Sequence, residues 1–283
     1  MARPIRLEFP NALYHVMSRG NGGENIFIEE ADKHAFLELF EELLICYDFI
    51  CYAYCLMNNH YHLLIETPKA NLSQVMRGLN GRYTKYFNKT FHRMGHIFQG
   101  RYKSIIVQKD SYLLELSRYI VLNPVRAGLI QNPEDYIWSS YCATIGQCEC
   151  PKWLAADNLL AEFHNQRIEA MRLYQKFVNQ GIGRPFSGKI TQQTYLGNEA
   201  FVNDVQKHID TQQSNSIHIT QLSKKAPKKT IEEIISTVPE RKEAMNAIYK
   251  TGHYTMFEIA QYYGVHYSTV SRAIRSFRAK CND

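Results

Sequence analysis

The sequence predicts an α+β protein, with an antiparallel sheet and helices in its first half and an all-α region at its C-terminal end. In the first half, segments with strand-like alternation are interspersed with segments whose apolar residues have helical spacing. A polar, lysine-rich stretch at 212–229 has the composition of a linker. From Thr230 onward only helical patterns follow. These three observations divide the chain into domains at 1–147 and 230–283, joined by accessory helices and a basic linker at 148–229.

The first half alternates between strand and helix patterns. The spacing predicts a strand at 12–18, a helix at 29–46, strands at 49–57 and 60–66, a helix at 72–88, a strand at 104–108, and a helix capped by Asp110 and running to about Leu122. Asn58-Asn59 predicts a tight turn, because Asn tolerates left-handed backbone. This order is that of the ferredoxin-like split βαβ arrangement, with helices on one face and the 60–66 strand in a central position.

The second half is predicted to be helical. Apolar spacing indicates helices at 159–178, 199–209, 231–238, 239–250, 255–263 and 267–279. Ala260, Gly264 and Val270 fall where a helix-turn-helix needs a small residue, a turn glycine and a buried aliphatic. The last helix would then expose groups suited to phosphates and base edges of duplex DNA: Ser268, Thr269, Ser271, Arg272 and Arg275. A small helical bundle without a role in DNA binding is the alternative.

Composition favours a cytoplasmic protein. The 283 residues are 45% apolar, and no apolar run is long enough to cross a bilayer. Residues 1–10 lack the apolar stretch of a secretory signal, and the odd number of cysteines, seven, is typical of reduced thiols. The net charge of +6 permits a nucleic-acid partner without requiring one.

The distribution of positive charge is more informative than its total. Residues 77–103 contain no Asp or Glu and interleave basic with aromatic side chains, among them Arg77, Arg82, Tyr83, Lys85, Tyr86, Arg101, Tyr102 and Lys103. Cations for phosphates and rings for unpaired bases together suit a single strand of nucleic acid. A solvated basic face is the competing interpretation.

Four residues predict a catalytic site. On a strand, His60 and His62 present two imidazoles to one face. On a helix, Tyr119 and Asn123 are neighbours four residues apart. A His-x-His pair alone is more often incidental than a metal site. With a phenol and an amide oxygen beside it, however, the pair predicts metal-assisted attack on a phosphodiester.

The ligand set suggests which metal the site would hold. His60, His62 and the Asn123 oxygen suit Mn²⁺ or Mg²⁺, and a three-ligand site with an open position leaves Zn²⁺ as an alternative. Tyr119 would act as the nucleophile because a cation stabilises the charge that develops on the phosphate. The product would be a 5′-phosphotyrosine link and a free 3′ hydroxyl.

The motifs resemble those of the REP-associated tyrosine transposases, single-tyrosine members of the HUH (His-hydrophobic-His) single-strand nucleases. Four blocks over about residues 3–145 carry the resemblance: Tyr14-His15-Val16-Met17-Ser18-Arg19-Gly20-Asn21, Met57-Asn58-Asn59-His60-Tyr61-His62-Leu63-Leu64, Phe98-Gln99-Gly100-Arg101-Tyr102-Lys103-Ser104 and Arg118-Tyr119-Ile120-Val121-Leu122-Asn123-Pro124-Val125-Arg126-Ala127-Gly128. The resemblance implies a ferredoxin-like fold, His60 and His62 as metal ligands, Asn123 in the third-ligand position, and Tyr119 as nucleophile. It also implies that Arg19, Arg101 and Lys103 contact the strand.

The leading hypothesis is therefore a transposase that nicks and transfers single-stranded or hairpin DNA, with duplex DNA as a partner of the C-terminal region. Two alternatives stay open: a replication or mobilisation nickase with the same site, and a DNA-binding regulator with an idle site. The sequence also leaves open whether the protein forms a homodimer.

Overall fold

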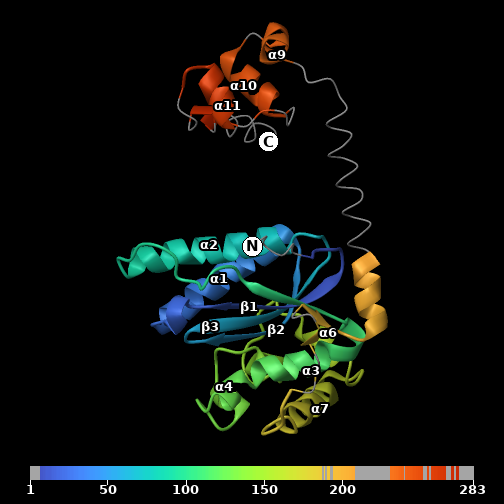
Figure 1. Cartoon of the computed structure of the whole chain (residues 1–283). Helices are drawn as coiled ribbons and strands as arrows, with labels where there is room; N and C mark the ends of the chain where they lie inside the picture. Colours follow the sequence, from blue (N-terminus) through green and yellow to red (C-terminus); the bar gives the residue numbers. More distant parts are fainter. Residues whose placement is uncertain are drawn as a thin grey trace. The chain divides into compact units, whose positions relative to one another are not determined.

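The computed structural model describes residues 7–186, 188, 190–191, 194–207, 230–238, 240–250, 254, 256–265, 269–270 and 272–273 (Figure 1). The chain divides into two units, residues 1–209 and 210–283. Each unit is described by itself below. The residues from 148 to 207, predicted as accessory, lie in the first unit together with the sheet.

One sheet organises the first unit. Its strands are β1 (Ala12–Arg19), β2 (Ile50–Met57), β3 (His60–Thr67), β4 (Lys103–Val107), β5 (Ile190–Thr191) and β6 (Tyr195–Leu196), in the order β2-β3-β1-β4-β6-β5. The first four strands pair antiparallel, as predicted, and β3 is flanked by β1 and β2. However, β6 pairs parallel to β4, so the prediction of a purely antiparallel sheet is wrong at this edge. Strands of two residues leave no alternation for a pattern to reveal.

Helices cover both faces of the sheet (Figure 1). One face packs against α1 (Glu30–Tyr47) and α2 (Leu72–Thr90). The other packs against α3 (Lys109–Val121), with α6 (Ala156–Leu160) and α7 (Arg167–Asn179) adding to the same core. The prediction of helices on one face is therefore wrong. The burial of β3 agrees with this, since every residue after the first is buried, as expected for a strand that is covered on both sides.

Several helix boundaries also differ from prediction. Gln108 is the N-cap of α3 and Asp110 lies in its first turn, so Asp110 is not the cap. The chain does not leave the helical region at Asn123, because α4 (Asn123–Arg126) follows α3 directly with Pro124 in its first turn. The helix predicted at 159–178 is two helices, α6 and α7, separated by a non-helical segment at 161–166. Residues 199–207 are helical, as expected. Three short elements complete the unit: η1 (Asn21–Gly23), η2 (Pro133–Asp135) and α5 (Tyr141–Thr144).

The outer edge of β2 is hydrogen-bonded to later parts of the chain. Leu56 N donates to Trp138 O at 2.9 Å, and Ser140 N donates to Tyr54 O at 3.0 Å. Farther along, Ala155 N donates to Cys51 O at 2.8 Å. Residues 138–155, which follow β4 in the chain, therefore occupy hydrogen-bonding positions along the outer edge of β2.

The second unit contains α9 (Ile231–Thr237), α10 (Arg241–Lys250) and α11 (Met256–Tyr262). A capping box between Thr230 and Glu233 opens α9. Ile248, Ile259 and Val270 are fully buried in a shared core. Residues 269–270 and 272–273 are helical, whereas the rest of the helix predicted at 267–279 lies outside the described residues, as does most of the predicted linker.

Two expectations from composition can be compared with the described part of the chain. No helix there is long and apolar enough to span a bilayer. Six cysteines there are free thiols.

Candidate active site

Three strands and one helix meet at a pocket of about 340 Å³. Arg19 at the end of β1 pairs with His60 at the start of β3, and Met17 pairs with Lys103 at the start of β4. The last turn of α3 supplies Tyr119, and Asn123 begins α4. The pocket is lined by Met17, Ser18, Arg19, His60, His62, Gln99, Arg101, Lys103, Tyr119 and Asn123. All four residues predicted to form the site line this one pocket.

The alternation of β3 aims both histidines at the pocket. Tyr61, Leu63 and Ile65 belong to the core beneath α1 and α2. The residues between them face the opposite side, toward α3. The rings of His60 and His62 lie with centroids 5.0 Å apart and planes at 82°. The two imidazoles are thus side by side, as the His-x-His spacing predicts.

Each histidine is held through its Nδ1 atom. His60 Nδ1 lies 2.6 Å from Asn59 Oδ1, which can only accept, so His60 Nδ1 carries the proton. His62 Nδ1 lies 2.9 Å from Nε2 of His15, a residue of β1 that is only 3% exposed. Both contacts leave Nε2 of the β3 histidines available to bind a metal, an arrangement common around metal-binding histidines.

Burial keeps these imidazoles neutral. It lowers the pKa of His15 to about 4. Burial also lowers the pKa of His60, helped by the charge of Arg19, and places the pKa of His62 well below its usual value. Neutral imidazole is the form that binds metal ions.

Tyr119 stands across the pocket from the histidines. Its ring centroid lies 6.1 Å from that of His62 and 5.9 Å from that of His15. On its other side the ring packs against Phe186, with centroids 5.0 Å apart, and the Arg126 guanidinium lies 4.7 Å from the ring centroid. These contacts hold the phenol between the histidines and a cation, and fix its direction.

Asn123 is oriented by its own helix. Its Nδ2 donates to the carbonyl oxygens of Tyr119 at 3.0 Å and Ile120 at 3.3 Å. The amide nitrogen is thereby occupied, and Oδ1 is the atom left for a cation. Among the described residues no cluster of three His, Cys, Asp or Glu side chains could hold a metal. A third protein ligand beside His60 and His62 would therefore have to be an uncharged oxygen, and Asn123 Oδ1 fits that requirement.

The pocket is basic, because Arg19, Arg101 and Lys103 line it and no lining residue is acidic. Arg82 lies elsewhere: it projects from α2 and forms an ion pair with Glu42 of α1. In the second unit, Thr269 is half-buried and Arg272 is exposed. Ser268, Ser271 and Arg275 lie outside the described residues.

Four residues beside the site were not singled out from the sequence: His15, Gln99, Arg126 and Phe186. His15 carried a readable signal, since it is a histidine at an alternating position between Leu13 and Met17 of a predicted strand. Gln99 and Arg126 are within blocks that resemble the family but have no spacing that predicts a role. Phe186 reaches Tyr119 only through tertiary packing.

Comparisons with known proteins find similar sequences over the part of the chain that holds the site. Residues 8–123 match the family model described as "Transposase IS200 like". A Haemophilus influenzae protein named as a REP-associated tyrosine transposase is 26% identical over 106 residues, which are 34% of this chain and 60% of that protein. The match thus spans less than two thirds of the relative's length.

Two solved structures are also similar to parts of the chain. A REP-associated tyrosine transposase bound to a REP hairpin has a TM-score of 0.45 at 16% identity, covering 55% of this chain and 92% of the other. A Deinococcus radiodurans protein described as a transposase has a TM-score of 0.31 at 16% identity, covering 42% and 95%. The match to the family model, over residues 8–123, contains all four site residues.

Proposed function

We propose that this protein is a metal-dependent transposase that nicks single-stranded or hairpin DNA and transfers the cut strand through a 5′-phosphotyrosine intermediate. The observation that carries the proposal is the placement of Tyr119 across one basic pocket from His60 and His62. The match of residues 8–123 to the IS200-like transposase model supports the same reaction class.

Tyr119 supplies the nucleophile. Its oxygen bonds to phosphorus while the bond from phosphorus to the 3′ oxygen breaks. The phenol loses a proton and the departing 3′ oxygen gains one, so the step balances without a further reactant. The reverse attack by a 3′ hydroxyl restores the phosphodiester, and a different 3′ hydroxyl gives strand transfer.

The surrounding residues position the reacting groups. Arg19, Arg101 and Lys103 would bind the phosphates on either side of the scissile bond. His60, His62 and Asn123 would hold a divalent ion, Mg²⁺ or Mn²⁺. When bound, this ion would supply Lewis-acid stabilisation of the phosphate charge. Arg126 and Phe186 keep the phenol ring aligned with the pocket.

We also propose that the second unit is a helix-turn-helix that binds duplex DNA near the target. Three observations support it: Ala260 is 3% exposed, Gly264 after α11 has a φ of +63°, and Val270 is fully buried. Thr269 and Arg272, with Ser268, Ser271 and Arg275, would contact the duplex. Deleting residues 230–283 should weaken binding to target duplex while leaving nicking of a single strand intact.

The catalytic proposal is tested with end-labelled hairpin DNAs incubated with purified protein, with and without Mn²⁺ or Mg²⁺, on denaturing protein gels. We expect a metal-dependent label that migrates with the protein. Tyr119→Phe should abolish it while leaving DNA binding nearly unchanged, because the change removes one hydroxyl. Tyr112→Phe is the matched control, since Tyr112 lies on the same helix and lines none of the pockets described for this unit.

The outcomes separate the alternatives. An adduct that persists in Tyr119→Phe would show that the nucleophile is misassigned. Binding without any adduct, across varied hairpins and both metals, would favour a regulator with an idle site. Nicking without strand transfer would favour a replication or mobilisation nickase.

A further inference from the structure

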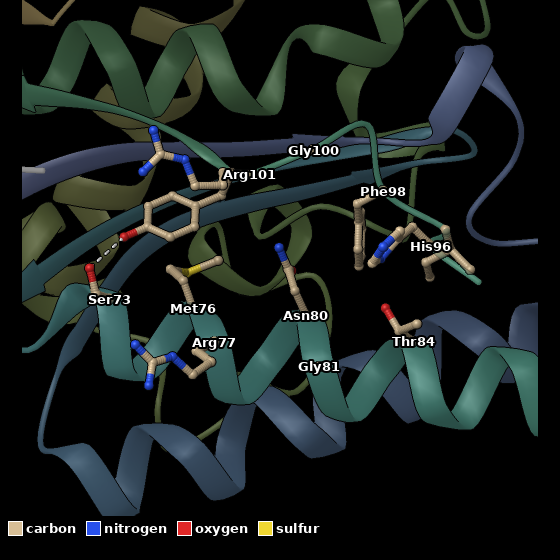
Figure 2. Close-up of a pocket in the computed structure, with 12 residues that line it drawn as sticks. Ser73, Met76, Arg77, Asn80, Gly81, Thr84, His96, Phe98, Gly100 and Arg101 are labelled. Carbon is tan, nitrogen blue, oxygen red and sulfur yellow. Dashed lines mark hydrogen bonds between the residues drawn. The ribbon is translucent and has the colours of Figure 1, made fainter. Parts of the chain in front are cut away.

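A second hollow, of about 500 Å³, lies between α2 and the segment at 96–102 (Figure 2). Met76, Asn80 and Thr84 rise from α2 toward that segment, and Phe98 and His96 face α2 from the other side. We call this hollow the α2 groove. The proposed nicking reaction assigns it no role.

Gly81 lines the α2 groove without a side chain. Glycine inside a helix costs about 1 kcal/mol relative to alanine, so a reason for it is worth seeking. Gly78, one turn earlier, has a packing reason, since a Cβ there would lie 3.0 Å from Leu43 Cδ2 of α1. A Cβ at Gly81 would meet nothing within 4 Å, although Gly81 lines the groove. Internal packing therefore does not explain Gly81, whereas an occupant of the groove would.

The groove has the chemistry of a single-strand site. Arg77 and Arg101 line it, and no lining residue is acidic. Exposed His96 offers a ring on which an unpaired base can stack, and the buried rings of Phe98 and Tyr102 add apolar lining. In a duplex the base faces are covered by neighbouring base pairs, so the lining favours a single strand.

Arg101 joins the α2 groove to the catalytic pocket, because it lines both. We propose that the α2 groove binds the single-stranded nucleotides that flank the scissile phosphate, with Arg77 and Arg101 on their phosphates and the exposed His96 ring against a base. The proposal rests on the proposed nicking function for the position of the scissile phosphate, and its test reads binding instead of chemistry.

The test uses the full chain carrying Tyr119→Phe, so that binding is measured without cleavage. The probe is a fluorescein-labelled oligothymidylate, followed by anisotropy over a series of salt concentrations, with a duplex of equal length as comparison. Gly81→Leu should weaken oligothymidylate binding at least about fivefold, the loss of about one stacked base. Gly81→Ala, which adds a single methyl group, should weaken it much less.

Arg77→Gln and Arg82→Gln form a matched pair, since both remove one charge from α2 and only Arg77 lines the groove. Arg77→Gln should reduce the slope of log affinity against log salt by about 0.7, the value for one phosphate contact on a single strand. Arg82→Gln should change the slope much less. Thermal melting monitored by circular dichroism checks that each variant is folded.

Three results would overturn the groove proposal: unchanged binding in folded Gly81→Leu, equal slopes in the two arginine variants, or an equal loss of duplex and single-strand binding. Each is distinct from a failure of nicking. If an adduct forms at Tyr119 but Gly81→Leu binds DNA as well as the parent, only the groove proposal is contradicted. If Gly81→Leu weakens binding but no adduct forms, only the nicking proposal is contradicted.

Discussion

The two faces of β3 show how a catalytic site and a core can share one strand. Toward α1 and α2, Tyr61, Leu63 and Ile65 are fully buried among aromatic side chains. Toward α3, Leu64 is equally buried, but His62 and His60 open onto the pocket. The first core contains Tyr61, at the start of the strand, whereas the second begins only at Leu64 and leaves out His60 and His62. The site occupies the place where the second core is left unfilled.

The sharpest way to test this contrast is to change neighbours that face opposite sides. His60→Ala removes a proposed metal ligand from the half-buried end of β3. Because metal stabilisation of a phosphoryl transition state is worth several kcal/mol, the cleavage rate should fall by about a thousandfold or more. The unfolding midpoint should change little. Cleavage is measured on labelled hairpins. A rate close to that of the parent would show that His60 is not needed for cleavage.

Tyr61→Ala should produce the opposite pattern. Truncating a fully buried aromatic side chain costs about 3–5 kcal/mol, from lost burial and the cavity left behind. The free energy of unfolding in urea should fall by that amount, and activity should follow the folded fraction. A stable Tyr61→Ala protein would contradict the assignment of this face to the core.

His15→Leu tests whether the contact between β1 and β3 serves the metal. The change removes His15 Nε2, the atom that lies 2.9 Å from His62 Nδ1, and replaces the imidazole with an apolar side chain of similar size. Loss of such an orienting partner typically weakens metal binding about 10–100-fold. Isothermal titration with Mn²⁺ gives the affinity directly. An unchanged affinity would make the His15–His62 contact structural only.

Low pH should lower the free energy of unfolding through protonation of His15, His60 and His62. Each of the three histidines has a folded pKa below its unfolded value near 6.5, that of His15 being about 4. The unfolded state therefore binds protons that the folded state excludes, and stability is lost as pH falls from about 6.5 toward 4. Urea unfolding of metal-free protein measures this loss. His15→Leu should show a shallower dependence, and equal slopes would contradict the burial of His15.

The smallest expected effect is a difference in the free energy of unfolding between alanine variants of two glycines of α2. Gly81→Ala should raise the free energy of unfolding by about 0.5–1 kcal/mol, because the helix gains a better former and the Cβ enters open space. Gly78→Ala should gain less or lose, because its Cβ crowds Leu43. Urea titrations of both variants give the difference, and its reversal would contradict the packing of α1 on α2.

Local patterns were sufficient to predict the first four strands and the three long helices between and after them. Periodicity also predicted that His60 shares a face with His62, and Tyr119 with Asn123. That the two pairs meet was expected from the split βαβ topology and from the family resemblance. The parallel strand β6 could not be predicted, since its pairing joins residues about ninety positions apart. Nor could the contact of Phe186 with Tyr119, which depends on how α7 returns the chain to α3.

Arg82 and Arg77 show a further limit of sequence. Both belong to the same basic stretch, and only the packing of α1 decides that Arg82 meets Glu42 while Arg77 lines the α2 groove. The prediction that all helices lie on one face was wrong for a related reason, although α3 itself was predicted. Continuous apolar runs in β2 and β3 do indicate burial on both sides, but they do not identify the element that covers the second side.

The hydrogen bonds along β2 and the parallel strand beside β4 have a consequence for self-association. An open strand edge is a template on which another chain can add, and proteins guard against this. Here the outer edge of β2 is taken by residues 138–155 and that of β4 by β6, both from the same chain. A second copy that paired with β2 or β4 would first have to displace residues 138–155 or β6, and the strand that ends the sheet beyond β6 is β5, with only two residues.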